Sequence, residues 1–126
     1  MIDCFCDYDP AHVYVASAPT ARKRHRCYDC GGFVEPGEKH EKVFAVWERG
    51  DSPDTVRTCP RCLDLRTWVQ NNVPCFCYMH GGLFETAKDA IEAAYDRARD
   101  EVTGLRFGYL RRRILLNKHN AAARAA

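Results

Sequence analysis

The chain contains no run of about 20 apolar residues, which is the length that a membrane-spanning helix needs. Its first ten residues hold three aspartates and no lysine or arginine, so they lack the basic start of a secretory signal. With 126 residues the chain is too short for a large enzyme fold and fits one ordinary globular domain. We therefore expect a cytoplasmic protein with no membrane partner.

Acidic side chains are missing from the end of the chain. Residues 105–126 hold six basic and no acidic residues, although the formal net charge of the whole chain is only +2. A second basic cluster occupies residues 22–26. Such segments are candidates for contact with phosphates or with an acidic protein. The candidate partner-binding residues are Arg22, Lys23, Arg24, Arg26, Arg106, Arg111, Arg112 and Arg113.

No cysteine is left unpaired in the sequence pattern. The eight cysteines form four close pairs, which are Cys4/Cys6, Cys27/Cys30, Cys59/Cys62 and Cys75/Cys77. In a reducing compartment such pairs are more typical of zinc ligands than of disulfides, because glutathione keeps thiols reduced. Tetrahedral zinc takes four thiolates, so eight of them predict two zinc ions. The sequence alone does not distinguish zinc from iron.

The pair Cys27/Cys30 has the pattern of a metal-binding knuckle. Two glycines, Gly31 and Gly32, follow the second cysteine directly. A knuckle turn needs a residue with positive φ and backbone amides that can point at sulfur, and glycine suits both requirements. This pair is therefore the strongest metal signal in the sequence.

The order of elements around the two central cysteine pairs predicts a known zinc-finger architecture. Residues 40–48 alternate apolar and polar side chains as a strand does, and residues 55–58 can return after a turn. A helix predicted over residues 63–72 begins at the second pair, where its N-terminal end would help to hold the thiolates deprotonated. Knuckle, β-hairpin and helix in this order resemble a treble-clef zinc finger over residues 26–72.

The hairpin brings together one set of four cysteines and leaves another set. We expect the first zinc ion to be held by Cys27, Cys30, Cys59 and Cys62. The second zinc ion would then be held by Cys4, Cys6, Cys75 and Cys77, which would fasten the N-terminus to the body. His80 lies three residues past Cys77 and is a possible substitute for one thiolate. The alternatives are free thiols at the N-terminal pair and an ordinary surface or capping role for His80.

Two further helices are predicted after the cysteines. Apolar residues recur at three- and four-residue steps between Gly82 and Gly104, which indicates an amphipathic helix packed on the zinc-bound body. From Tyr109 onward the chain is predicted to form a basic helix, with Phe107, Leu110 and Ile114 on one arc. We therefore expect an α+β fold with a two-zinc domain over residues 1–104 and a basic helix or tail over residues 105–126.

The basic helix leaves several roles open. It can dock on a partner, form a homodimer through its apolar arc, lie along phosphates, or remain solvated with a frayed end. We expect substitution of Arg111, Arg112 and Arg113 to leave folding intact and to weaken partner binding.

Three stretches of the chain are similar to small zinc-finger proteins of tailed phages and prophages. They read RKRHRCYDCGGFVEPGEKHEKVFAVW, RTCPRCLDLRTWV and CFCYMHGGLFETAKDA, and the resemblance covers residues 3–95. It depends on the paired cysteines, on residues 36–38 (Pro-Gly-Glu) and on the Cys-Pro-Arg-Cys pair. The resemblance implies a viral origin, a bacterial host cell and metal binding, and it implies no reaction.

No catalytic residue is predicted. An HNH-type nuclease needs a histidine base and ligands for a hard metal on the hairpin and the following helix. Only His40 stands at the hairpin, and residues 63–72 contain no histidine. A redox C-x-x-C motif usually comes singly, and closed four-thiolate zinc has no open coordination position. We therefore expect a protein that is not an enzyme, with an HNH-type nuclease relative as a minor alternative.

A binding function remains. By analogy with phage accessory proteins of this size, we expect docking on and modulation of a host protein or complex, including transcription machinery and defence complexes such as CRISPR effectors. The alternative is a nucleic-acid-binding regulator of transcription or DNA processing that contacts DNA or RNA through the basic segments. Two four-thiolate zinc sites would turn the net charge negative, which counts against this alternative.

Overall fold

The computed structural model describes residues 10–73, 75–98 and 104–125. The chain divides into two compact units, Asp7–Leu63 and Asp64–Ala126, the latter together with Met1–Cys6. The predicted boundary at residue 104 stays a prediction.

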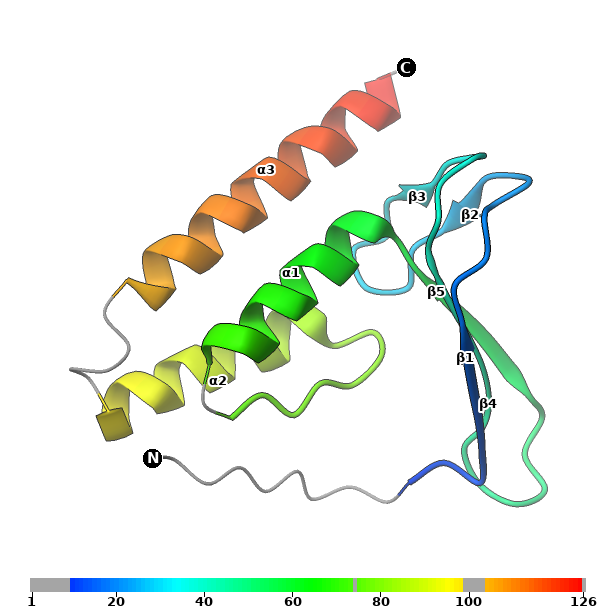
Figure 1. Cartoon of the computed structure of the whole chain (residues 1–126), viewed down its shortest axis with the longest axis horizontal. Helices are drawn as coiled ribbons and strands as arrows, with labels where there is room; N and C mark the ends of the chain where they lie inside the picture. The colour runs from blue at the N-terminus through cyan, green and yellow to red at the C-terminus, as the bar shows by residue number, and fades with distance from the viewer. Residues whose placement is uncertain (1–9, 74, 99–103, 126) are drawn as a thin grey trace. The chain divides into compact units, whose positions relative to one another are not determined.

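The first unit contains all the strands of the described residues (Figure 1). They are β1 (Val13–Ser17), β2 (His25–Arg26), β3 (Phe33–Val34), β4 (Glu41–Val46) and β5 (Asp54–Thr58). Strands β1, β4 and β5 form one antiparallel sheet in the order β1-β4-β5, and β2 pairs with β3 in a separate short hairpin. The β4–β5 hairpin confirms the predicted strand over residues 40–48 and its return.

The alternation predicted for the central strand is present. Val43 and Ala45 of β4 are buried, and Val43 pairs with the buried Val56 of β5. These three side chains form the hydrophobic cluster of this sheet, while Phe44, on the opposite face, is exposed. Three side chains of this size make a small core, so this unit needs another source of stability.

Strand β1 was not predicted. All five of its residues are exposed, and its register places Tyr14 opposite Ala45. An exposed edge strand has no buried face whose pattern would identify it. The pairing with β4 is therefore visible only in the folded chain.

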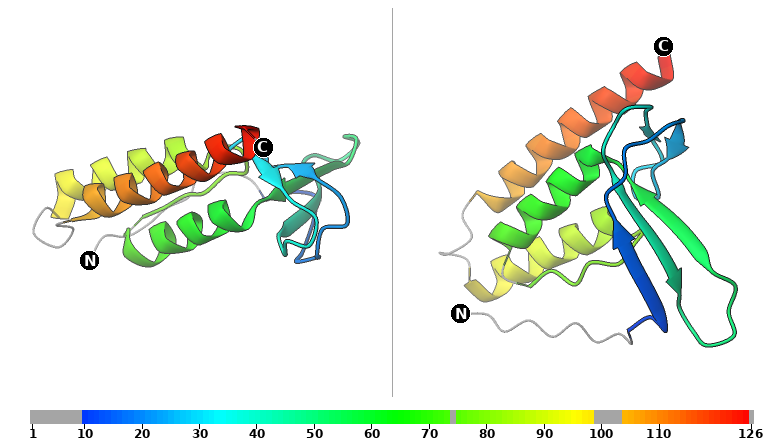
Figure 2. Two further views of the ribbon diagram at one scale, coloured as in Figure 1. Left: turned by 90° about the horizontal axis from the view of Figure 1, so that it is seen from above. Right: turned by 45° about the vertical axis from the view of Figure 1, so that its right-hand side comes forward.

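The described ranges also contain three helices, and Figure 2 shows them from two further sides. They are α1 (Pro60–Asn72), α2 (Leu83–Ala98) and α3 (Leu105–Ala125). Helix α1 begins at a proline, which is favoured at the first helical position because its missing N–H has no partner to lose there. Helix α3 begins at Leu105, where the predicted basic helix or tail begins, and continues to Ala125.

The helices of the second unit bury apolar stripes that the sequence predicted. In α2 the buried residues recur at helical spacing, namely Leu83, Ala87, Ile91 and Ala94. In α1 Leu65 and Val69 are buried on one face. The three-to-four-residue spacing in α2 confirms the predicted amphipathic helix, and α1 confirms the helix predicted over residues 63–72. The packing of α2 on the zinc-bound body stays a prediction.

Helix α3 packs on α1 and α2 through polar as well as apolar side chains. The Arg112 guanidinium lies 4.3 Å from the ring centre of Trp68 in α1, and that of Arg113 lies 3.7 Å from the ring centre of Phe84 in α2. The Tyr109 hydroxyl donates a hydrogen bond to the Phe84 carbonyl over 3.2 Å. Arginines stacked on aromatic faces contribute packing as well as charge.

A glycine permits the close approach of α3 to α1. A Cβ placed on Gly108 would lie 2.6 Å from one atom of the Trp68 indole and 2.9 Å from another. These distances are shorter than van der Waals contact, so a methyl group at this position would push the two helices apart. Gly108 is therefore a packing residue although it lies inside a helix.

We predict that Gly108→Ala destabilises the protein by about 1 kcal/mol, because the clash costs about 1–3 kcal/mol. Helix propensity alone predicts the opposite sign, a gain of about 1 kcal/mol. Chemical denaturation of both proteins measures the difference. In a Trp68→Leu background, where the indole is absent, the same substitution should become stabilising, and a loss of stability there would contradict the proposed contact.

Candidate metal centre

Four cysteine sulfurs converge in the first unit. Cys27 and Cys30 lie in the turn between β2 and β3, while Cys59 follows β5 and Cys62 lies in the first turn of α1. All four Sγ atoms lie within 4.8 Å of one another. This is the group of four that the sequence predicted for the first zinc ion.

The spacing of the sulfurs fits tetrahedral zinc. The Cys27 and Cys62 Sγ atoms are 3.8 Å apart, and so are those of Cys30 and Cys59. A regular tetrahedron with Zn–S bonds of about 2.3 Å has sulfur–sulfur edges of about 3.8 Å. A disulfide would need sulfurs at about 2.05 Å. The distances therefore match a common central ion and exclude a disulfide among these four.

Backbone amides are directed at the sulfurs. The Gly32 N–H donates to Cys30 Sγ over 3.3 Å, and the N–H of Cys62 in α1 donates to Cys59 Sγ over 3.4 Å. Gly31 has a φ of 70°, in the left-handed region that glycine favours. These contacts confirm the predicted knuckle and the predicted orientation of the helix N-terminus. Such N–H···S bonds stabilise thiolates and orient them for the metal.

The negative charge of four thiolates at this place would require a nearby cation. Hydrogen bonds from Cys27, then Cys59 and Cys62, lower the pKa of Cys30. The pKa of Cys62 is raised by its hydrogen bonds with Cys27, Cys30 and Cys59 and by burial. Four thiolates cannot share this buried volume alone because like charges repel. A divalent cation at the centre removes this obstacle, which is the behaviour of a zinc-binding cluster.

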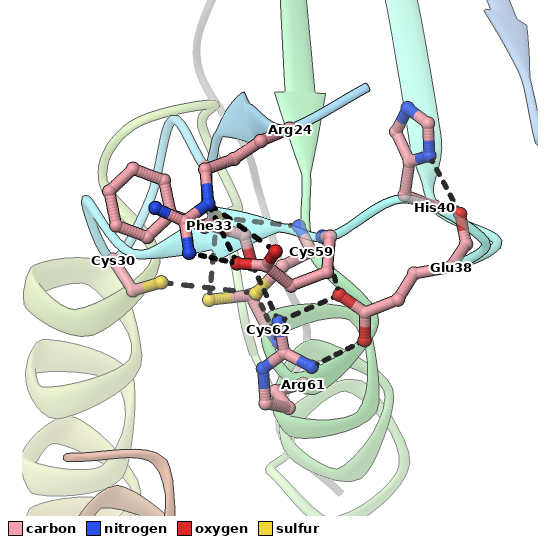
Figure 3. A network of polar contacts seen from close by, with 10 residues as sticks. Arg24, Cys30, Phe33, Glu38, His40, Cys59, Arg61 and Cys62 are labelled. Carbon is pink, nitrogen blue, oxygen red and sulfur yellow. Dashed lines mark hydrogen bonds and ion pairs between the residues drawn. The ribbon is translucent and has the colours of Figure 1, made fainter. Parts of the chain in front are cut away.

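Beside the sulfurs, an ion pair links the Cys59/Cys62 pair to the segment that follows the Cys27/Cys30 pair (Figure 3). Arg61, between Cys59 and Cys62, pairs with Glu38, its Nη1 lying 2.7 Å from Oε2. The Arg61 Nη2 also donates to the Phe33 carbonyl of β3 over 2.7 Å. Both side chains are largely covered, so their mutual attraction is only partly screened by water. These residues lie in the Pro-Gly-Glu and Cys-Pro-Arg-Cys stretches on which the sequence resemblance depends, and the sequence analysis gave them no role.

The histidine considered for nuclease chemistry has both ring nitrogens engaged. His40 is buried, its Nδ1 lies 3.3 Å from the Glu38 carbonyl oxygen, and its Nε2 lies 2.8 Å from Nη1 of Arg57. Because a guanidinium only donates, Nε2 must accept and Nδ1 must carry the proton. This arrangement engages both ring nitrogens with neighbouring groups of the chain and leaves neither of them free.

Only part of the predicted second site lies among the described residues. Cys4 and Cys6 lie outside the described residues, and Cys75 and Cys77 are disulfide-bonded. A disulfide sulfur is not a thiolate, so it is not a zinc ligand in that state. The Nδ1 atom of His80 lies 3.2 Å from the Tyr78 hydroxyl. The second zinc ion and the ligand role of His80 therefore stay predictions.

Most of the predicted partner-binding arginines contact the chain itself. Arg24 pairs with Glu35 at 2.9 Å, Arg26 donates to the Gly31 carbonyl, and Arg106 pairs with Glu92 at 2.6 Å. Arg112 and Arg113 stack on aromatic rings, as described above. Within the described ranges, Arg22, Lys23 and Arg111 are exposed and make no ion pair or hydrogen bond through their side chains.

The expectation that residues 111–113 can be replaced without affecting the fold therefore holds only for Arg111. Loss of Arg112 or Arg113 removes a contact between α3 and another helix of the same unit. The charge pattern marked all three alike because it does not record which side of a helix faces its neighbours.

No family model, curated protein or solved structure matches this chain. The resemblance to phage zinc fingers therefore stays a prediction. Within the described ranges, none of the helices has an apolar stretch that could cross a membrane.

We predict that Cys27→Ser and Cys62→Ser each abolish zinc binding at this centre and unfold the strand-containing unit. Metal binding and folding are coupled in such sites, so a chelator should unfold the wild type in the same way. Elemental analysis and circular dichroism of purified protein provide the measurements. Acidification should release the ion as well, because protons compete with the metal for the thiolates. A fully folded, metal-free wild type would contradict the assignment.

The number of ions is tested with a second cysteine. Cys75→Ser should leave the first ion in place. In wild-type protein purified under reducing conditions, a content of two zinc ions that falls to one in this variant would establish the predicted second site. One ion in both proteins would limit zinc to the centre described here.

We further predict that Arg61→Ala lowers stability by about 1–3 kcal/mol, because it leaves the Glu38 carboxylate half-buried without its partner. The release of zinc to a chromogenic chelator should also become faster. Arg49→Ala, an exposed arginine of the same unit, is the matched control. Equal zinc-release rates in the two variants would show that the ion pair has no influence on the metal centre.

Proposed function

We propose that the chain is a non-enzymatic protein whose structural zinc ion, or two ions if the second site forms, supports a surface that docks on another protein. The observation that carries the first part is the tetrahedral spacing of four cysteine sulfurs, of which Cys27, Cys59 and Cys62 are buried. Four thiolates complete the coordination of zinc, so no position remains for water or substrate. His40 adds support because both of its ring nitrogens already have partners within the chain.

The unit around the metal is treble-clef-like in this proposal. A knuckle between β2 and β3, the β4–β5 hairpin and the first turn of α1 follow one another in that order. One ligand pair comes from the knuckle and the other from the start of α1, and their four sulfurs lie within 4.8 Å of one another. The supporting evidence is this order of elements and the pairing of the ligands.

Exposed apolar side chains support docking on a protein. Tyr14 and Val15 of β1, Tyr28 of the knuckle, and several residues of α3 are large, apolar and exposed. Large exposed apolar side chains of this kind are found at protein interaction sites. Five of the eight predicted phosphate-contacting residues are already engaged within the chain, which weakens the case for a nucleic acid.

A nucleic-acid partner is the second candidate, and one observation favours it. The pKa of His25 is lowered, first by burial and then by the positive charges of Arg57 and Lys23. The neighbourhood before the knuckle is therefore electropositive, and the side chains of Arg22 and Lys23 are exposed there. Such a cluster can contact phosphates at the cost of strong salt dependence.

The biological setting belongs to the same proposal. The resemblance to zinc fingers of tailed phages supports an accessory protein that acts in the cytoplasm of a bacterial host. A host protein or complex, such as one of a defence system, is then the partner. Thiols kept reduced there would allow the cysteine cluster to hold zinc.

Capture from bacterial lysate tests the two partner classes. We predict that the zinc-loaded protein retains a protein partner after nuclease treatment, because the contact is with protein and not with a bridging nucleic acid. Its affinity for a DNA and an RNA oligonucleotide should be weak at physiological salt. Arg22→Ala/Lys23→Ala is the variant that separates the candidates. Tight oligonucleotide binding that falls steeply with salt and is lost in this variant would overturn protein docking in favour of the second candidate.

A further inference from the structure

Helix α3 has an outer face that the fold does not use. Its inner face buries Leu105, Leu116 and Asn120. On the outer face Phe107 is 72%, Leu110 56%, Ile114 45% and Leu115 57% exposed. Four large apolar side chains within about two and a half turns are unusual on a free helix surface. Nothing in the second unit's described residues covers them.

The outer face is shaped as a groove. Phe107, Leu110, Arg111, Ile114 and Leu115 line a depression of about 220 Å³, which we call the outer groove. Phe107, Arg111 and Leu115 form one row of i, i+4 side chains, and Leu110 and Ile114 form the next row. A groove between two such rows is the feature into which the side-chain ridge of a second helix packs. The shape therefore favours an α-helix as the occupant.

The charge around the outer groove indicates the kind of helix. Arg111 lines the groove, and Lys118 is exposed one turn beyond Ile114. Helix α3 contains no aspartate or glutamate between Leu105 and Ala125. A second α3 packed in this groove would bring these cations together without any acidic partner, which disfavours a homodimer. A helix with acidic residues beside an apolar stripe would satisfy both features.

We propose that the outer groove binds an amphipathic helix of a partner protein, with its apolar stripe in the groove and its aspartates or glutamates beside Arg111 and Lys118. This inference rests on the proposed function, because it specifies the partner of a docking protein. It assigns separate roles to neighbouring arginines. Arg112 and Arg113 hold α3 on its own unit, while Arg111 faces the partner.

A selection from a peptide library tests the proposal without a known partner. The zinc-loaded protein is immobilised and offered helical peptides of about 18 residues, or five turns. Their apolar residues are fixed at helical spacing, and the flanking positions vary among Glu, Gln and Lys. We expect Glu to be enriched at the flanks. Enrichment of Lys or of no charge, or no enrichment above the Leu110→Asp protein, would overturn the proposal.

Substitutions then locate the bound peptides. Binding of the selected acidic peptides should fall by about tenfold or more in Arg111→Glu and be lost in Leu110→Asp. Arg111→Glu should in turn bind the lysine-flanked peptides better than the wild type does. Arg124→Glu, at the far end of the same helix, is the control and should bind as the wild type. An equal loss in the control would show that only overall charge matters and would overturn the assignment.

Two further measurements cover the other occupants. Concentration-dependent dimerisation in sedimentation that Leu110→Asp abolishes would replace the partner helix by a second copy. Tighter binding to vesicles of phosphatidylglycerol than to the acidic peptides would replace it by a membrane surface. Unfolding curves show that each variant is folded. If Leu110→Asp still captures the nuclease-resistant partner from lysate, this inference fails while the proposed docking function stands.

Discussion

The fold of the strand-containing unit depends on four thiolates that can coexist only around a cation. Its hydrophobic cluster consists of Val43, Ala45 and Val56, which supply a few kcal/mol on burial. Structural zinc contributes about 10–16 kcal/mol in small zinc-finger peptides. A zinc ion bound by the four cysteines would therefore contribute more to the stability of this unit than this cluster does. Because Cys59 and Cys62 precede and begin α1, the same ion would also fix where the helix starts.

The metal centre could be predicted from the sequence because its signals are local. A C-x-x-C pair followed by Gly31 specifies a turn by spacing and φ alone, and the alternation around Val43 specifies a strand by its buried face. The Arg61–Glu38 pair joins residues that only the folded chain brings together, so no local sequence pattern predicts this ion pair. Strand β1 escaped prediction for a related reason, since it pairs by backbone and buries no side chain.

The basic residues show the limit of reasoning from charge. Arg111, Arg112 and Arg113 are equivalent in a charge count, but successive helix residues are rotated by about 100°. Arg112 and Arg113 meet Trp68 and Phe84, whereas Arg111 faces away from both helices. Which of the three arginines is available to a partner therefore depends on which of them lie on the inner face of α3.

The residues on the two faces of α3 differ in what they contribute to the packing of the helix. This difference indicates that the outer face has a function. The inner face carries stacked arginines and a glycine, Gly108, that fits against the Trp68 indole. Together with the buried Leu105 and Leu116, these residues pack the helix on its own unit. The outer face nevertheless exposes Phe107, Leu110 and Leu115 to water, although the fold gains nothing from them there. Large apolar residues at such positions cost solubility unless another surface covers them, so the stripe is better explained by an interaction than by the packing of the chain itself.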